Sequence, residues 1–353
     1  MIWKVLCLVS IVAQAAAAES LPRSLNRLAP PTTQSAAPVE RYSASGLPLR
    51  LDGATGDQRQ WLQSFDVPAE PFDYTLQLIE DDGNLQVYRL VFNSPFVSPF
   101  PENNVVPAEL YLPTQRQAKV PAAIVLDIMY GNAVVPRGLA RGLASQGVAA
   151  VYLPMAYYNA RRPKGDAHIK WIDEDPARAI EPIRQTVMDI RRAKAILTSR
   201  PEIDPARIGI TGVSLGGIMT SIAAGVDGHF WRVCPILAGG NLPDMIFHAR
   251  ETRKVKEQLL AKGFDEQKLA PIMASVEPLH FADRIDPARC LMINAAQDEV
   301  IPKSCTLALW QAIAKPTLLW LPTGHYGAAW YLPTIKQTAI DFLKGQPVTH
   351  LEF

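Results

Sequence analysis

The stretch Arg207–Gly225, RIGITGVSLGGIMTSIAAG, decides the fold of this chain of 353 residues. It begins as an apolar run of strand length and ends as an apolar run of helical length. Between the two stands Gly212-Val213-Ser214-Leu215-Gly216, a G-x-S-x-G motif. A serine at so sharp a strand-to-helix turn has crowded neighbours, which must therefore be glycines. The motif predicts a nucleophilic Ser214, and the alternative is a small-residue helix start that serves only close packing.

Further apolar runs of strand length lie on both sides of this stretch. The expected strands are 87–92, 105–112, 122–126, 148–153, 208–213, 233–238, 291–295 and 317–321. The first two leave no room for a helix between them, which favours an antiparallel pair, whereas the later ones alternate with longer segments. The sequence predicts an α/β fold, with a mostly parallel eight-stranded sheet and helices on both faces.

One helix can be predicted in detail. Its apolar residues recur at steps of three and four, and it ends at Arg200-Pro201; they are Ile180, Ile183, Val187, Ile190 and Ile196. The same pattern directs four cations mostly toward solvent, namely Arg184, Arg191, Arg192 and Lys194. Residues 241–286 are largely helical in pattern and belong to no strand, so we expect a helical cap insertion there, with its charge run on a solvated face.

The N-terminus is typical of an exported protein. One Lys4, an apolar stretch and the run Ala15–Ala18 predict a signal peptide over residues 1–18, and the alternative of an uncleaved anchor is disfavoured by the short apolar stretch. Residues 19–70 are rich in Pro, Ser and Ala, which predicts a flexible leader. The catalytic domain is expected over 71–353, in a protein that is periplasmic or extracellular.

Composition excludes several classes of function. Hydrophobic residues make up 48%, charged residues 20%, and the formal net charge is +1, so nucleic acid is not an expected partner. After signal cleavage no apolar run is long enough to span a membrane. The sequence has no zinc-type Cys/His spacing, no Gly-rich phosphate loop and no H-E-x-x-H, so neither a cofactor nor a catalytic metal is expected. Oligomeric state is left open.

A serine nucleophile needs a histidine base and a carboxylate that orients the base. Asp298 follows strand 291–295 and His325 follows strand 317–321, so both lie on loops at the sheet edge where Ser214 is expected. Glu299 is the alternative acid, expected to point the other way. Of the histidines after the acid, His350 lies in a polar tail and is disfavoured.

The oxyanion that forms in such a reaction needs two backbone N–H donors. Leu215, directly after the nucleophile, is one; on the loop after strand 122–126, Ile128 is the first choice for the other and Met129 the second. Asp127 precedes them, either as an acid that perturbs the nucleophile or as a buried hydrogen-bonding residue.

Substrate contacts are suggested by two loops at the same edge. Their aromatic and cationic side chains could hold an anionic or sugar-bearing group, and the alternative is that the aromatics pack and the cations are solvated. The candidates are Tyr130, Tyr157, Tyr158, Arg161 and Arg162.

With these residues, the chain from about 85 to 345 resembles the α/β-hydrolase superfamily, in particular its dienelactone hydrolase and acetyl xylan esterase-like branch. The resemblance is carried by D-I-M-Y-G-N at Asp127, by R-I-G-I-T-G-V-S-L-G-G at the serine, and by A-x-x-D-x-V-I-P from Ala295 to Pro302. It implies Ser214, Asp298 and His325 as a triad. Dienelactone hydrolases carry cysteine as nucleophile, so Ser214 favours an ordinary ester.

We therefore expect an exported serine hydrolase that cleaves a small-molecule carboxylic ester through an acyl-enzyme. Two alternatives stay open. One is a peptidase of the prolyl-oligopeptidase type, although the usual large β-propeller is absent from the sequence. The other is a noncatalytic relative that binds a ligand or partner. The acyl and alcohol groups of the substrate are not indicated.

Overall fold

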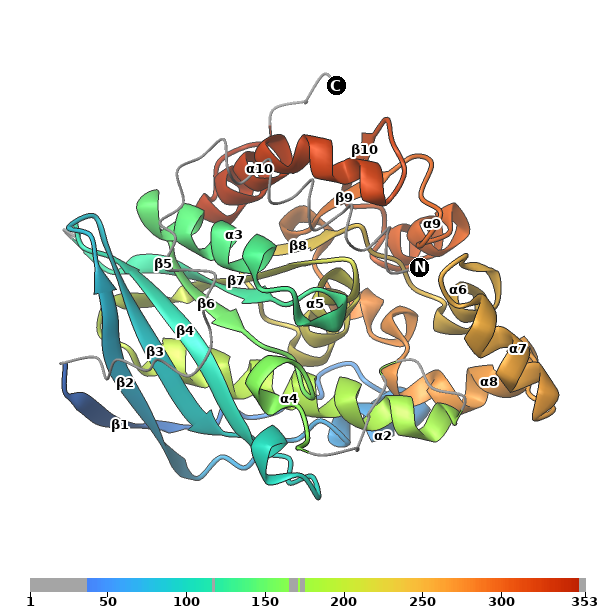
Figure 1. The fold of residues 1–353 in the computed structure, drawn as a ribbon, viewed down its shortest axis with the longest axis horizontal. Helices are drawn as coiled ribbons and strands as arrows, with labels where there is room; N and C mark the ends of the chain where they lie inside the picture. Colours follow the sequence, from blue (N-terminus) through green and yellow to red (C-terminus); the bar gives the residue numbers. More distant parts are fainter. Residues whose placement is uncertain (1–36, 116–117, 165–170, 172–174, 349–353) are drawn as a thin grey trace.

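The computed structural model describes residues 37–115, 118–164, 171 and 175–348. In this part of the chain, strands form a ten-stranded sheet in the order β1-β2-β3-β4-β6-β5-β7-β8-β9-β10 (Figure 1). They are β1 (Val39–Ser45), β2 (Pro71–Asp81), β3 (Leu85–Asn93), β4 (Val105–Pro113), β5 (Val120–Leu126), β6 (Ala149–Leu153), β7 (Ile203–Val213), β8 (Val233–Ile236), β9 (Leu291–Ala295) and β10 (Thr317–Leu321).

The sheet is mixed. Strands β5 to β10 pair in parallel, whereas β1 to β4 pair antiparallel with one another and β4 pairs antiparallel with β6. Each strand expected from an apolar run is present, and the pair formed by β3 and β4 is antiparallel as predicted. The α/β fold class is therefore confirmed, with ten strands in place of eight.

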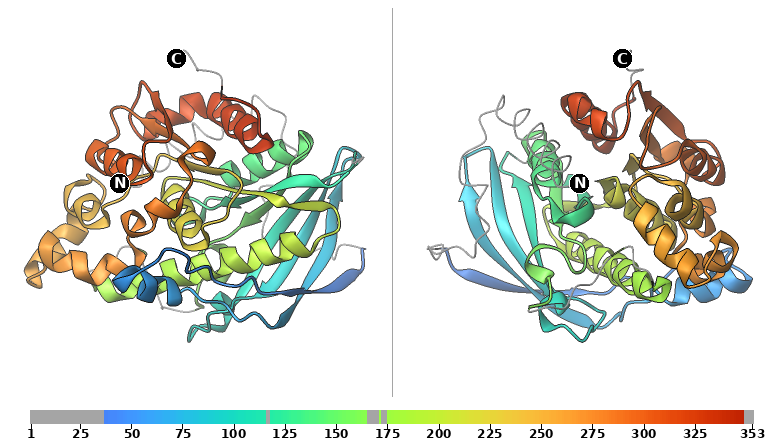
Figure 2. Two further views of the ribbon diagram at one scale, coloured as in Figure 1. Left: turned by 180° about the vertical axis from the view of Figure 1, so that it is seen from behind. Right: turned by 45° about the vertical axis from the view of Figure 1, so that its right-hand side comes forward.

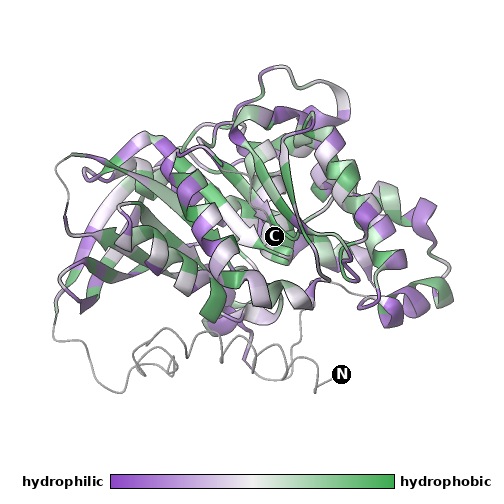
Figure 3. Cartoon of the chain, turned by 90° about the horizontal axis from the view of Figure 1, so that it is seen from above, coloured by the Kyte–Doolittle hydropathy of each residue, from purple (hydrophilic) through white to green (hydrophobic). Residues whose placement is uncertain are grey.

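Helices cover both faces of the sheet (Figure 1). Helices α3 and α10 pack on one face, and α4, α5 and α9 on the other. In Figure 3 the strands in the middle of the molecule are mostly apolar and the hydrophilic colour concentrates on the outer helices. The helices are α2 (Gly56–Gln63), α3 (Val134–Ser145), α4 (Pro176–Ser199), α5 (Leu215–Asp227), α6 (Leu242–His248), α7 (Arg253–Ala261), α8 (Glu266–Met273), α9 (Lys303–Ala312) and α10 (Leu332–Lys344).

The two strands that the sequence did not reveal lie at the N-terminal edge. In β2 buried residues alternate with exposed or partly exposed ones, because it belongs to the antiparallel part of the sheet, and an alternating strand has no continuous apolar run. Strand β1 is the edge strand, and most of its residues are exposed. Apolar runs therefore reveal strands β3 to β10 but not these two.

The leader expected over residues 19–70 is wrong for the part that the structure describes. Residues 37–70 contain β1 and α2, and the side chains of Leu62 and Phe65 are fully buried. Figure 2 shows this N-terminal segment, in blue, running beside helix α4. The predicted signal peptide and the rest of the leader lie outside the described residues and stay predictions.

Arg191 of α4 contacts this segment directly, and two further cations of the helix, Arg192 and Lys194, are also buried. Arg191 is 3% exposed and donates to the carbonyls of Phe65, at 2.7 Å, and Leu47, at 2.9 Å. Arg192 donates to the carbonyl of Asn93 at 2.7 Å, and Lys194 pairs with Asp227. The expectation that these cations point to solvent is therefore wrong for all but Arg184, which is partly exposed. The N–H groups of Arg191 and Arg192 donate to backbone carbonyls, and Lys194 is neutralised by Asp227.

The segment expected to form a cap contains α6, α7 and α8, which lie between β8 and β9. Helix α6 starts next to the sheet, where the carboxylate of Glu277 accepts the N–H groups of Asn241 and Leu242 at 2.7 Å each. Among the described residues no helix is both long and apolar enough to cross a membrane.

Replacing Arg191 with Met should lower the free energy of unfolding by about 3 kcal/mol, because the buried carbonyl of Phe65 and the partly buried carbonyl of Leu47 lose a charged donor. Arg178→Met is the matched control, since Arg178 lies on the same helix with its side chain 70% exposed, and should change stability by less than about 0.5 kcal/mol. Urea denaturation measures both. Equal effects of the two substitutions would contradict a role of Arg191 in holding residues 37–70.

Candidate active site

Ser214 lies at the turn between β7 and α5, and its backbone is in an unfavourable conformation. Its φ is 58° and its ψ is −118°, a combination that L side chains rarely adopt. The N–H of Ser214 donates to the carbonyl of Ile236 on β8 at 2.9 Å, which fixes the turn to the neighbouring strand. The turn directs the hydroxyl out of the sheet edge and places the N–H of Leu215 at the start of α5, where no intrahelical acceptor exists.

Glycines surround Ser214 because nothing larger fits. A Cβ atom on Gly212 would lie 2.5 Å from the carbonyl oxygen of Gly216, and one on Gly216 would lie 2.3 Å from that of Asp127. A Cβ on Gly217 would lie 2.5 Å from the carbonyl oxygen of Ile236. Such contacts are far inside van der Waals distance, so the motif reflects the close approach of α5 to the ends of β5 and β8.

The structure brings together the three side chains that the sequence nominated. Nε2 of His325 lies 3.0 Å from Oγ of Ser214, and Nδ1 of His325 lies 2.8 Å from Oδ2 of Asp298. Asp298 is fixed in turn, because its Oδ1 accepts the N–H groups of Val300 and Ile301 at 2.8 and 2.7 Å. With Asp298 accepting the Nδ1 proton, Nε2 of His325 is the nitrogen free to accept a proton from Ser214.

Glu299, the alternative acid, has a different place. Its Oε2 accepts the backbone N–H of His325 at 2.9 Å, so it touches the histidine loop and not the imidazole. A Cβ on Gly324 would lie 2.4 Å from the same oxygen, which explains a glycine before the histidine. From the sequence, Glu299 was expected to point the other way from Asp298. The contact of its carboxylate with the backbone of His325 was not expected.

Asp127 organises the loop that follows β5. Its side chain is fully buried, and its carboxylate accepts from the N–H of Ile128 at 3.1 Å, from Nδ2 of Asn159 at 2.9 Å and from the hydroxyl of Tyr152 at 3.2 Å. The buried hydrogen-bonding role is thus the one the structure supports. Asn159 has no motif around it, and sequence reasoning missed it.

The hydrogen bonds of Asp127 affect which backbone N–H on this loop is available as an oxyanion donor. The N–H of Ile128 is directed at the carboxylate of Asp127, so the first choice of donor on this loop already has an acceptor. Among the described residues, the structure gives the N–H of Met129 no such acceptor. Tyr130, next along the loop, has a φ of 69° and accepts from Nη2 of Arg162 at 2.9 Å through its carbonyl.

The substrate-contact candidates divide into two groups. Arg161 is fully buried, pairs with Asp189 at 2.7 Å and donates to the carbonyl of Asn103, so it is structural and the prediction of a substrate contact is wrong. Tyr157 and Tyr158 are 4% and 7% exposed and pack against Phe100 and Trp171, which supports the packing alternative for these two aromatics. Tyr130, which is 66% exposed, and the exposed Arg162 stay candidates.

Two family models match the chain. The family model described as alpha/beta hydrolase domain containing 18 matches residues 54–243, and the model of the prolyl oligopeptidase family matches residues 183–318. The protein is an α/β-hydrolase. The chain belongs to the alpha/beta hydrolase domain containing 18 family, and the matched residues include the turn at Ser214 and residues 54–70 of the N-terminal segment.

Solved structures show the same fold at low sequence identity. The acetyl xylan esterase from Paenibacillus sp. R4 has a TM-score of 0.64 at 21% identity, over 82% of this chain and 92% of that one. Acetyl xylan esterase 1 from Thermoanaerobacterium sp. has a TM-score of 0.63 at 17% identity, over 86% and 96%. The acylaminoacyl peptidase of Pyrococcus horikoshii has a TM-score of 0.55 at 17% identity, over 79% of this chain and 45% of that one.

Two uncharacterized proteins of Mycobacterium tuberculosis, from strains CDC 1551 and H37Rv, are each 29% identical over 159 residues. The match covers 44% of this chain and 36% of each relative, so it spans only about a third of their length.

Burial raises the pKa of Asp127 to about 7, against the opposing effect of its hydrogen bonds, first of all the one from Ile128. Between pH about 4 and 7 the unfolded chain ionises this carboxyl while the folded protein keeps it protonated. Stability should therefore fall with rising pH across this window, by up to about 1.4 kcal/mol per unit, and level off above it.

Urea denaturation of wild type and Asp127→Asn from pH 4 to 9 tests this. As the pH rises to about 7, the free energy of unfolding should fall in wild type but not in Asp127→Asn, so the variant becomes more stable relative to wild type. Asp73→Asn, at an exposed position on β2, controls for the loss of one carboxylate. A difference between wild type and Asp127→Asn that does not change with pH would contradict the raised pKa.

Proposed function

We propose that this protein is a serine hydrolase that cleaves a carboxylic ester. The observation that carries the proposal is the unbroken chain of contacts from Oγ of Ser214, through the imidazole of His325, to the carboxylate of Asp298. A serine hydroxyl is a weak nucleophile until a neighbouring base accepts its proton. The strained turn at Ser214 presents the hydroxyl at the sheet edge where such a base lies.

In the proposed reaction Oγ of Ser214 attacks the ester carbonyl while Nε2 of His325 accepts the hydroxyl proton. Asp298 stabilises the imidazolium by accepting its Nδ1 proton. His325 then protonates the leaving alcohol, which gives an acyl-enzyme on Ser214. Water, deprotonated by His325, attacks the acyl carbonyl, and the proton returns to Ser214 as the acid leaves.

The negative charge on the tetrahedral intermediate requires N–H donors that have no acceptor of their own. We assign Leu215 as one donor, because it is the first residue of α5. We assign Met129 as the second in preference to Ile128, because Asp127 already accepts the Ile128 N–H. The hydrogen bonds of Asp127 to Asn159 and Tyr152 would hold this loop in position.

Ester cleavage is supported by the sequence resemblance to the esterase-like branch and by the fold shared with acetyl xylan esterases. A noncatalytic binding role is less well supported, since it would require the site groups to be misaligned. Export of the protein stays a prediction from residues 1–18.

Ser214→Ala should lower kcat/KM for 4-nitrophenyl acetate by about 10⁴-fold or more, because the nucleophile is lost. Ser221→Ala is the matched control, since the hydroxyl of this buried serine donates within the same helix, to the carbonyl of Gly217 at 3.1 Å. The control should keep its activity within a few-fold. Full activity in Ser214→Ala would overturn the proposed mechanism.

Peptide cleavage is the second candidate, favoured by the match of residues 183–318 to the prolyl oligopeptidase family. Hydrolysis of an ester and of a 4-nitroanilide with the same N-acetylated aminoacyl group distinguishes an esterase from a peptidase. We expect turnover of the ester that depends on Ser214 and no measurable turnover of the anilide. Comparable kcat/KM values for the two substrates would assign the protein to the peptidases.

A further inference from the structure

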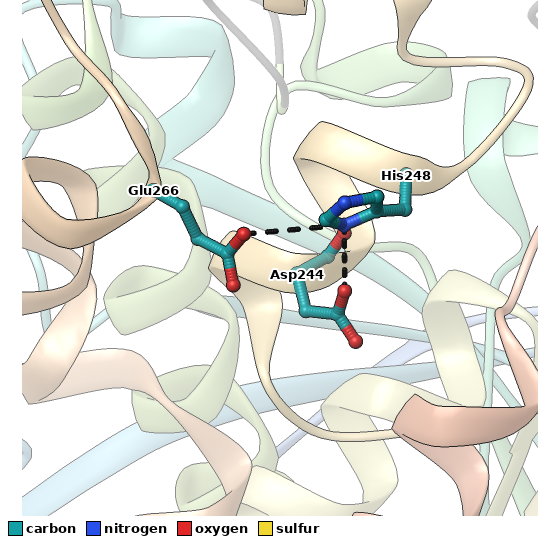
Figure 4. Close-up of side chains that lie close together, drawn as sticks. All are labelled: Asp244, His248 and Glu266. Atoms are coloured by element: carbon teal, nitrogen blue, oxygen red, sulfur yellow. Dashed lines mark hydrogen bonds and ion pairs between the residues drawn. The ribbon is translucent and has the colours of Figure 1, made fainter.

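A cluster of metal-ligating side chains lies away from Ser214, on the helical insertion between β8 and β9. Asp244 and His248 are one turn apart on α6, and Glu266 is the first residue of α8. One ligand atom from each of the three lies within 4.8 Å of the others. Figure 4 shows the imidazole of His248 between the two carboxylates, with Glu266 facing it from the neighbouring helix.

We propose that Asp244, His248 and Glu266 bind a divalent transition-metal ion of the Zn²⁺ type, which ties α6 to α8. Nδ1 of His248 lies 2.7 Å from Oδ1 of Asp244, 4.0 Å from Oε2 of Glu266 and 3.1 Å from the backbone carbonyl of Asp244, a contact that a bound ion would replace. Ligand atoms about 2.1 Å from a tetrahedral Zn²⁺ are about 3.4 Å apart. The two separations from Nδ1 lie on either side of that value, and all three ligand atoms lie within 4.8 Å of one another, so modest side-chain shifts complete the site.

The ligand set selects the class of metal. One imidazole nitrogen and two carboxylate oxygens suit Zn²⁺, whereas Ca²⁺ and Mg²⁺ prefer oxygen ligands alone. Three protein ligands leave a fourth position for water. The side chains of His248 and Glu266 are 57% and 41% exposed, so an ion can enter from solvent.

Asp244 is held in place by groups behind it. Its Oδ2 accepts from Oγ of Ser304 at 2.9 Å and lies 3.3 Å from Sγ of Cys305, both at the start of α9. Hydrogen bonds of this kind orient a ligating carboxylate and leave its other oxygen, Oδ1, for the metal. Lys268, two residues after Glu266, does not neutralise this carboxylate. Its Nζ donates to the carbonyl of Gly263 at 2.7 Å.

A helical ion pair between Asp244 and His248 is the alternative, since residues four apart on a helix commonly pair. It accounts for the 2.7 Å contact but gives no reason for the carboxylate of Glu266 to face the same imidazole from another helix. Metal binding accounts for both contacts. The two readings differ in one observable, which is saturable binding of Zn²⁺ that depends on His248.

The test is calorimetric titration of the full-length protein, treated with a chelator and dialysed, with Zn²⁺ alone. We expect one equivalent bound with micromolar affinity, a rise of the melting temperature on binding, and no binding of Mg²⁺ at the same concentration. His248→Ala and Glu266→Gln should each weaken Zn²⁺ binding by at least about tenfold. Both residues are exposed, so neither substitution should unfold the protein.

Two matched controls separate this site from chance binding at the surface. His229→Ala removes another exposed histidine, which contacts Arg50, and Glu257→Gln removes an exposed carboxylate of α7. Neither should change the affinity. No saturable binding at millimolar Zn²⁺, or binding that His248→Ala leaves unchanged, would overturn the proposal and leave an adventitious ion only.

Hydrogen exchange provides a second readout that does not depend on activity. Because α7 lies in the chain between the two helices that the metal joins, its amides should exchange more slowly when Zn²⁺ is bound. Exchange in α7 that is the same with and without Zn²⁺ would contradict the proposed link between α6 and α8.

Discussion

The close approach of helix α5 to the carboxyl ends of β5 and β8 is the constraint on which the rest of the site depends. Gly216 lies so near the carbonyl of Asp127, and Gly217 so near that of Ile236, that no side chain can stand at either position. The chain can make this approach only by a turn of left-handed φ at Ser214. The same turn fixes the hydroxyl at the sheet edge and leaves the first N–H of α5 without an intrahelical acceptor.

Loops from four other strands complete the arrangement around that turn. Asp298 and His325 follow β9 and β10, and each is held by backbone hydrogen bonds as well as by the contact between them. Asp127 follows β5 and reaches across to Asn159, which follows β6. The geometry at Ser214 therefore depends on the parallel register of these strands more than on any single contact, because the register brings their carboxyl ends to one edge.

The parallel half of the sheet and the three contacting side chains at its edge could be predicted from the sequence. Strands buried on both faces appear as apolar runs, and a G-x-S-x-G motif between a strand and a helix has few other uses. Strands β1 and β2 and the segment around α2 could not be predicted in this way. Residues of β1 and β2 are largely exposed or alternate in burial, and the spacing of Arg191 along α4 is the same whether its guanidinium meets water or the carbonyls of a distant segment.

Two groups of contacts could not be predicted from sequence patterns. Arg161 looked like a substrate-binding cation because it lies at the sheet edge, but its buried pairing with Asp189 joins residues 28 positions apart without any motif. Asp244, His248 and Glu266 have no metal-binding spacing in the sequence, since the third ligand comes from another helix. Such sites emerge only when the packing of separate elements is known.

The proposed function depends on activation of one serine by the fold. Labelling of the purified protein with a fluorophosphonate, followed by peptide mapping, tests it without knowledge of the substrate. The structure predicts one equivalent of adduct on Ser214, formed much more slowly when His325 is replaced by Gln. A folded protein that takes up no label, or takes it up at another serine, would contradict the assignment of Ser214 as the nucleophile.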